Sequence, residues 1–146
     1  MSKDSMLSDV DYEICCTQGR IYEYAANLGY DMELFSNEYL KSDFCRRAMD
    51  TDYSRFQFAD EEECWDFIIP EIGSKLEKID TGLYFDPDVA HWIGFTYRQI
   101  CFDRKVCSKD LPDKISFETM CRYYPGLHTI DEDAAMDIIR KDKFNE

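Results

Sequence analysis

The sequence feature that most constrains the fold is the stretch from Asp86 to Arg104, which begins like a helix and is apolar nearly all round. Asp86-Pro87-Asp88 places a capping residue, a proline at the first helical position and an acid in the first turn. The apolar residues that follow are Val89, Trp92, Ile93, Phe95, Tyr97, Ile100, Cys101 and Phe102. Because a helix that is apolar on every face is covered by other elements, the stretch predicts a central buried helix. Gly94 in its middle predicts a close crossing with a second helix.

Helical spacing also covers most of the first 50 residues. Apolar residues recur at helical intervals from Ser8 to Leu28, and Ser8 stands where an N-cap is expected. A second helix is predicted over residues 32–40. A third is predicted over residues 44–49, with Ser42 or Asp43 as its cap.

The middle of the chain combines a connection, a helix and a short extended stretch. Residues 50–60 have no helical period and are rich in turn formers, so we interpret them as an ordered connection. Asp60-Glu61-Glu62-Glu63 opens a further helix, because acids are favoured at the positive end of a helix. Pro70 is expected to kink or end that helix. Residues 79–85 are expected to be extended.

The last part of the chain carries more helix signals. Short helices are predicted over Ser108–Lys114 and Ser116–Tyr124, the second ended by Pro125-Gly126. Thr129-x-x-Glu132 has the spacing of a capping box and opens the last helix. No pair of alternating strand patterns and no internal repeat occurs in the sequence. The prediction is an all-α fold, a single compact domain of about six to eight helices with at most a short extended segment near 79–85.

Acidic residues dominate the charge, and they are unevenly placed. The net charge is −14. Up to Asp80 there are 8 basic and 19 acidic residues, against 9 and 12 afterwards, so the two parts carry −11 and −3. The break divides the chain into an acidic N-terminal subdomain, 1–80, and a C-terminal helical subdomain, 81–146, which share one core. Such a field disfavours nucleic acid and anionic membranes as partners and favours a protein with a basic surface. The alternative is that the acidity only keeps the protein soluble.

Seven cysteines indicate a reducing compartment rather than a disulfide framework. Their number is odd, and the first residues, Met-Ser-Lys-Asp-Ser-Met, lack the apolar segment of a signal peptide. Most of the cysteines stand among apolar residues, where a free thiol behaves as a small buried hydrophobe. No apolar run approaches the roughly 20 residues of a membrane span. We therefore expect a cytoplasmic protein that does not bind membranes.

No pattern of residues specifies a catalytic or metal site. Residue types that bind zinc occur late in the chain, at Cys101, Cys107, Cys121 and His128. Their spacing lacks the Cys-x2-Cys pair that is typical of zinc sites. A nucleophilic cysteine paired with His128 has no local motif to support it, and His91 is expected to be a hydrogen-bonded core or edge histidine. We therefore expect no catalytic residue, no metal and no cofactor, and we do not predict an enzyme.

One cluster of residues remains as a candidate binding surface, around the connection after residue 49. It consists of Arg46, Arg47, Asp50, Tyr53, Arg55 and Gln57. Arginine and tyrosine are the residue types that anchor protein interfaces, and here they lie within the acidic part of the chain. The alternative is that these arginines pair with acids of the same chain, and both can hold at once. A further alternative is a ligand pocket lined by Arg46, Tyr53, Arg55 or His128.

Several short motifs resemble two related families of small helical proteins. One set resembles a family of small uncharacterised helical proteins from gut Firmicutes: Tyr97-Arg-Gln-Ile-Cys101, the stretch from Ser108 to Leu111, and Tyr123-Tyr-Pro-Gly-Leu-His-Thr129 before a short acidic helix. The other set resembles a companion family: Leu28-Gly-Tyr-Asp-Met32, Asp43-Phe-Cys-Arg-Arg47 and Tyr53-Ser-Arg-Phe-Gln57. Together these similarities cover most of the chain. Proteins of this kind are encoded beside ADP-ribosyltransferase-like toxins, so the resemblance implies an antitoxin or accessory role and carries over no catalytic residue.

Charge, aromatic content and resemblance converge on one functional expectation. We expect a cytosolic protein-binding or accessory protein, antitoxin-like, that neutralises a partner enzyme. The alternative is a small ligand-binding domain or an enzyme with a pocket that no motif reveals.

Overall fold

Helices account for nearly all of the regular structure in the computed structural model, which describes residues 7–79 and 84–145. Within these residues there are eight α-helices: α1 (Asp9–Asn27), α2 (Met32–Leu40), α3 (Asp43–Ala48), α4 (Glu61–Ile72), α5 (Pro87–Arg104), α6 (Leu111–Lys114), α7 (Phe117–Leu127) and α8 (Glu132–Lys143). Three short 3-10 helices connect them: η2 (Arg55–Phe58), η3 (Gly73–Lys75) and η4 (Ser108–Asp110). In the described part of the chain, β structure is limited to one isolated bridge between Tyr30 and Lys78. The predicted all-α fold is confirmed. The predicted extended stretch falls largely on residues 80–83, which lie outside the described residues.

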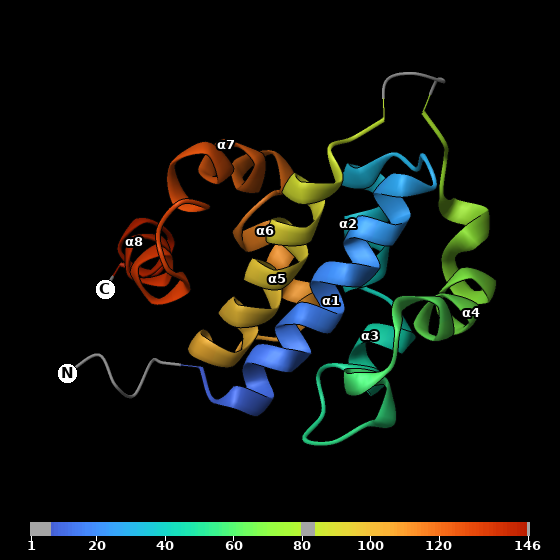
Figure 1. Ribbon diagram of the computed structural model, residues 1–146, viewed down its shortest axis with the longest axis horizontal. Helices are drawn as coiled ribbons and strands as arrows, with labels where there is room; N and C mark the ends of the chain where they lie inside the picture. The colour runs from blue at the N-terminus through green and yellow to red at the C-terminus, as the bar shows by residue number, and fades with distance from the viewer. Residues whose placement is uncertain (1–6, 80–83, 146) are drawn as a thin grey trace.

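The helices α1 and α5 lie side by side at the centre of the molecule (Figure 1). Their contact is close because glycines occupy the crossing. A Cβ atom at Gly94 would lie 2.7 Å from the Tyr22 ring and 2.8 Å from the Gln18 backbone oxygen. A Cβ atom at Gly19 would lie 2.9 Å from the His91 ring. The prediction of a close helix crossing at Gly94 is confirmed.

The remaining helices cover both sides of this pair. In Figure 1, α3 and α4 lie on one side of α1 and α5, and α7 and α8 lie on the other. One hydrophobic cluster joins the two sides, because it contains Phe35 and Ile68 from the first part of the chain and Ile93 and Met136 from the second. The helix α5 is central as predicted, and Ile93 is fully buried. The charge break near residue 80 therefore does not divide the core.

Most of the helix starts follow from capping side chains. Ser8, Ser42 and Asp60 each accept a hydrogen bond from the backbone N–H three residues later, as an N-cap residue does. The predicted cap at Thr129 is wrong, because α8 begins after Asp131, whose carboxylate accepts from the Ala134 N–H. Asp131 is the cap instead of Thr129, because its backbone has the extended conformation of a cap residue and its side chain reaches the N–H of the third helical residue.

Two prolines lie inside helices that they were predicted to interrupt. The helix α4 continues through Pro70 to Ile72, and α7 continues through Pro125 to Leu127. Both prolines occur in the last turn of their helix. Each proline is followed by only two helical residues, so the hydrogen bond that it lacks lies at the end of the ladder and the preceding turns keep theirs. The prediction that Pro125-Gly126 ends its helix is therefore wrong, and Pro70 does not end α4.

The helix crossing predicts a sharp difference between two glycines. Gly94→Ala should destabilise the fold by about 1–3 kcal/mol, because the new methyl group meets the Tyr22 ring and the backbone of α1. Gly126→Ala is the matched control. No atom lies within 4 Å of a Cβ there, and Ala in a helix gains about 0.5–1 kcal/mol over Gly. Urea unfolding followed by circular dichroism measures both, and equal effects of the two substitutions would contradict the crossing.

Candidate functional site

The most unusual polar residue in the core is Arg98, whose role the sequence did not reveal. It lies on α5 and is 1% exposed. Its guanidinium donates to the Asp50 carboxylate at 2.6 Å, to Gln18 Oε1 at 2.9 Å and to Ser108 Oγ at 2.7 Å. It also donates to Cys45 Sγ at 3.2 Å. A buried charge is tolerated only when it is paired and hydrogen-bonded, and Arg98 meets both conditions.

Asp50 ties this cluster to two other elements. Its Oδ1 accepts from Arg98 and from Ser108 Oγ, and its Oδ2 accepts from the Ser108 backbone N–H at 2.9 Å. The Asp50 side chain is 13% exposed. Asp50 was predicted as part of a binding surface, but its carboxylate is directed into the protein because Arg98 would otherwise be an unpaired buried charge. It therefore holds the chain after α3 against α5 and η4.

Gln57, another predicted surface residue, is 1% exposed and shapes the connection between α3 and α4. Its side chain accepts from the Ser54 N–H at 3.3 Å and donates to the Thr51 carbonyl at 3.0 Å. The backbone carbonyl of Gln57 accepts a hydrogen bond from Thr17 Oγ1 of α1 at 2.7 Å. Gln57 thus belongs to the internal hydrogen bonds of the fold, and it drops out of the predicted surface together with Asp50.

The other residues of the predicted cluster are exposed. Arg46 pairs with Asp43 at 3.3 Å, and Arg55 pairs with Glu63. These two arginines therefore pair with acids of the same chain, which was the alternative to an interface role. Arg47 is exposed, and within the described residues it makes no hydrogen bond or ion pair.

Aromatic side chains occur on the same segments as these arginines. Tyr53 is 78% exposed, and Phe58 and Phe67 are each 51% exposed. The Arg55 guanidinium lies 4.2 Å from the centroid of the Phe56 ring. Next to them is a hollow of about 410 Å³ that is lined by Asp43, Phe44, Arg47, Ala48, Ser54, Phe56, Phe67 and Glu71. We define the η2–α4 surface as the exposed residues of this hollow and of the adjoining segment 53–58: Arg47, Tyr53, Arg55, Phe58 and Phe67.

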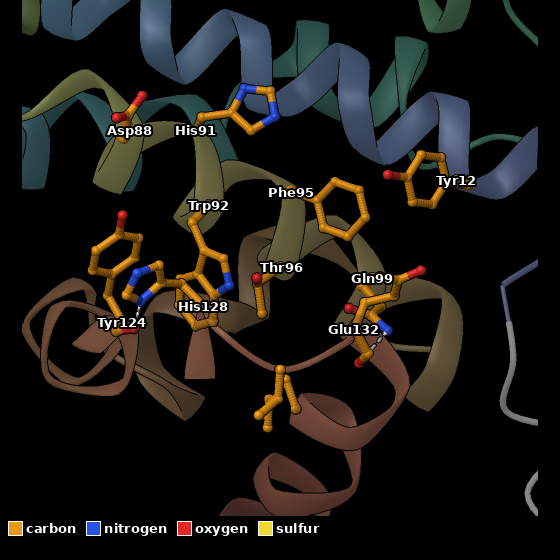
Figure 2. A pocket seen from close by; sticks show the side chains of 12 residues that line it. Tyr12, Asp88, His91, Trp92, Phe95, Thr96, Gln99, Tyr124, His128 and Glu132 are labelled. Atoms are coloured by element: carbon orange, nitrogen blue, oxygen red, sulfur yellow. Dashed lines mark hydrogen bonds between the residues drawn. The ribbon is translucent and has the colours of Figure 1, made fainter. Parts of the chain in front are cut away.

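His128 lies elsewhere, in a groove between α1, α5 and the α7–α8 turn (Figure 2). The groove has a volume of about 310 Å³, and we call it the aromatic groove. It is lined by Tyr12, Asp88, His91, Trp92, Phe95, Thr96, Gln99, Tyr124, His128, Ile130, Glu132 and Ala135. The alternative prediction considered His128, Arg46 and Arg55 as lining residues of one pocket. In the structure, His128 lines a groove to which neither arginine belongs.

Both histidines of the chain line the aromatic groove. His128 stacks on the Tyr124 ring with centroids 4.1 Å apart, and its Nδ1 lies 2.6 Å from the Tyr124 carbonyl oxygen. His91 Nδ1 lies 3.2 Å from the Glu23 carboxylate. The prediction that His91 is hydrogen-bonded is confirmed. One signal could have found this groove: Asp88, Trp92, Phe95 and Gln99 follow helical spacing along one face of α5.

The cysteines give no sign of reactivity in the described residues. All seven are free, and four of them are buried. Burial raises the pKa of the Cys45 thiol to about 11, although Arg98 beside it opposes the rise. Cys101 lies next to Ser108 in the Arg98 cluster, while His128 lines the groove. Across residues 7–79 and 84–145, no group of three His, Cys, Asp or Glu side chains has the arrangement of a metal site.

The sequence matches no protein-family model, no curated protein and no solved structure. Among the helices of the described residues, none combines the length and apolar character that crossing a membrane requires.

The burial of Arg98 predicts that Asp50 contributes to stability. Asp50→Ala leaves the guanidinium buried without its counter-ion and should cost about 3–5 kcal/mol of unfolding free energy. The control is Asp52→Ala, an exposed acid two residues away, which should change stability by less than about 0.5 kcal/mol. Chemical denaturation of both variants measures the difference. A small loss for Asp50→Ala would show that water reaches Arg98 and replaces the carboxylate.

Proposed function

We propose that this protein is a protein-binding domain that contacts a partner with a basic surface through the η2–α4 surface. The observation that carries the proposal is an open hollow lined by Phe44, Phe56 and Phe67 beside Arg47, in which Phe67 is 51% exposed. Two further exposed aromatic residues, Tyr53 and Phe58, belong to the same segment of chain as Phe56. Exposed apolar side chains that form a patch are typical of interaction sites, whereas single exposed apolar residues need no explanation.

The composition of this surface supports binding to a protein. Tyrosine and arginine are enriched among the residues that carry most of the binding energy at interfaces. Tyr53 presents a large ring with few rotatable bonds, and Arg47 makes no ion pair with the described part of the chain that binding would break. The hollow between Phe44, Phe56 and Phe67 offers an apolar recess for one side chain of the partner.

The surrounding charge favours a basic partner. The segments that carry the η2–α4 surface also carry exposed acids: Asp43, Asp52, Asp60, Glu62 and Asp66. The part of the chain up to Asp80, to which they all belong, carries −11 of the net charge of −14. Such a field speeds the approach of a basic protein and repels acidic ones. Arg47 and Arg55 would then pair with acids at the centre of the partner's surface.

A finer form of the proposal is an antitoxin-like role in the cytoplasm. An acidic domain of this kind could cover a basic cleft of a partner enzyme and so neutralise it. The charge distribution supports this role, and so does the resemblance to proteins encoded beside ADP-ribosyltransferase-like toxins. The test is co-expression with the product of the adjacent gene, followed by size exclusion and an assay of that product's activity. Separate elution with unchanged activity would refute the antitoxin role.

The general proposal predicts a pattern of variant effects on such a complex. Tyr53→Ala and Arg47→Ala should each weaken binding by about tenfold or more, because truncating an interface anchor costs roughly 2 kcal/mol. Ile138→Ala is the matched control, since Ile138 is a large apolar residue, 44% exposed, on α8 at the other side of the molecule. Calorimetric titration measures all three, and thermal unfolding checks that each variant is folded.

Two outcomes would contradict the placement of the interface. One is equal weakening by all three substitutions, which would indicate a general effect on the fold. The other is unchanged affinity for Tyr53→Ala and Arg47→Ala together with a loss for Ile138→Ala, which would move the interface to α8. Binding to a basic partner should also weaken as salt is raised, because exposed charges more than about 8 Å apart are largely screened at physiological ionic strength.

A further inference from the structure

The aromatic groove places ring systems at both of its ends. At one end Tyr12 and Phe95 meet edge to face, with centroids 5.3 Å apart. At the other end Trp92 meets Tyr124 edge to face at 5.9 Å. Figure 2 shows these two groups of rings facing the same hollow, with Thr96 between them. Tyr12 is 40% exposed, so a ligand can reach its ring from solvent.

Besides His91 and His128, the ionisable side chains on the groove are acidic carboxylates and the Tyr12 and Tyr124 phenols. Asp88 lies near the end formed by Trp92 and Tyr124, and Glu132 lies near the other end (Figure 2). Among the described residues, none that lines the groove is a lysine or an arginine. The negative field reaches the rings, because Glu132 contributes, after Cys16 and burial, to a raised pKa of Tyr12. At the other end burial, Asp86 and Asp88 raise the pKa of Tyr124.

Helix ends reduce this negative charge without cancelling it. Asp88 is in the first turn of α5 and Glu132 is in the first turn of α8. The N-terminus of a helix carries roughly half a positive elementary charge, whereas each carboxylate carries a full negative one. Asp86 and Asp131, which cap the two helices, add further negative charge at these ends. The balance at both ends of the groove therefore stays negative.

We propose that the aromatic groove binds a small organic cation with an ammonium or guanidinium head group. The faces of aromatic rings attract cations, and groups of aromatic rings are the means by which many proteins recognise quaternary ammonium ligands. Carboxylates beside the rings add direct attraction between opposite charges. The volume of about 310 Å³ is near the lower limit for small-molecule pockets, so it suits a small amine and excludes a large cofactor. This site lies across the α1–α5 pair from the η2–α4 surface and does not depend on the proposed function.

The first test compares a cation with its uncharged isostere. Choline and agmatine are titrated into the full chain by calorimetry at pH 8, where free imidazole is neutral. The neutral isostere of choline, with carbon in place of the quaternary nitrogen, is titrated in parallel. We expect at least one cation to bind with a dissociation constant of about 1 mM or lower, and the isostere to bind at least about tenfold more weakly. Equal binding of choline and its isostere, or no binding of either cation, overturns the proposal.

Variants locate the site on the protein. Trp92→Leu should weaken binding of the cation by about fivefold or more, since an aliphatic side chain lacks the ring face. Glu132→Gln should weaken it by about two- to fivefold, since one carboxylate near the groove is lost. Glu62→Gln is the matched control, because it removes the same charge from the first turn of α4, away from the groove. If Glu62→Gln weakens binding as much as Glu132→Gln does, the effect is one of net charge and the groove is not the site.

A final comparison separates two sources of the same chemistry. Agmatine represents a free metabolite, and an arginine residue capped at both ends represents the side chain of a protein. Tighter binding of agmatine assigns the groove to a free amine, and tighter binding of the capped arginine assigns it to a partner's side chain. Both outcomes support a cation site. Thermal unfolding with and without ligand serves as an independent readout, since a ligand that binds only the folded state raises the unfolding temperature.

Discussion

The close crossing of α1 and α5 is the contact on which the rest of the fold depends. Gly19 and Gly94 remove the side chains that would hold the two helices apart. At this distance the Gln18 amide of α1 donates to the Gly94 carbonyl of α5 at 2.9 Å, and its oxygen accepts from Arg98. The glycines therefore also allow the hydrogen bond between Arg98 and the side-chain oxygen of Gln18, because they let the two helices approach closely.

From this crossing a polar cluster extends through the core. Arg98 joins α5 to α1 through Gln18, to the end of α3 through Asp50, and to η4 through Ser108. A buried ion pair is weak evidence for stability by itself, but it has few alternative arrangements once its partners are fixed. The cluster thus sets the path of the chain after α3, and this path presents Tyr53 and Arg55 to solvent. The burial of Arg98 thus accounts both for the internal pairing of Asp50 and for the exposure of its neighbours Tyr53 and Arg55.

The two sides of the α1–α5 pair differ in chemistry. On the side of α3 and α4, arginines and aromatic rings lie on a largely open surface whose segments also carry exposed acids. On the side of α7 and α8, aromatic rings, two acids and two histidines line a groove, and none of its described lining residues is a lysine or an arginine. An open surface with arginines suits a protein partner, and a groove with rings and carboxylates suits a small cation. One hydrophobic core supports both surfaces.

Local signals in the sequence determined where most helices begin, because a cap depends on residues only a few positions apart. Ser8, Ser42, Asp60 and Asp86 could be read in this way, and so could the central position of α5. Tertiary structure decided which polar residues are internal. Asp50 and Gln57 look like their exposed neighbours in the sequence, and only the buried guanidinium, 48 positions away from Asp50, and the connection around η2 direct them inward. The groove likewise joins Tyr12 to Tyr124 and Glu132, and the spacing along α5 marks a face of that helix without saying which other helices meet it.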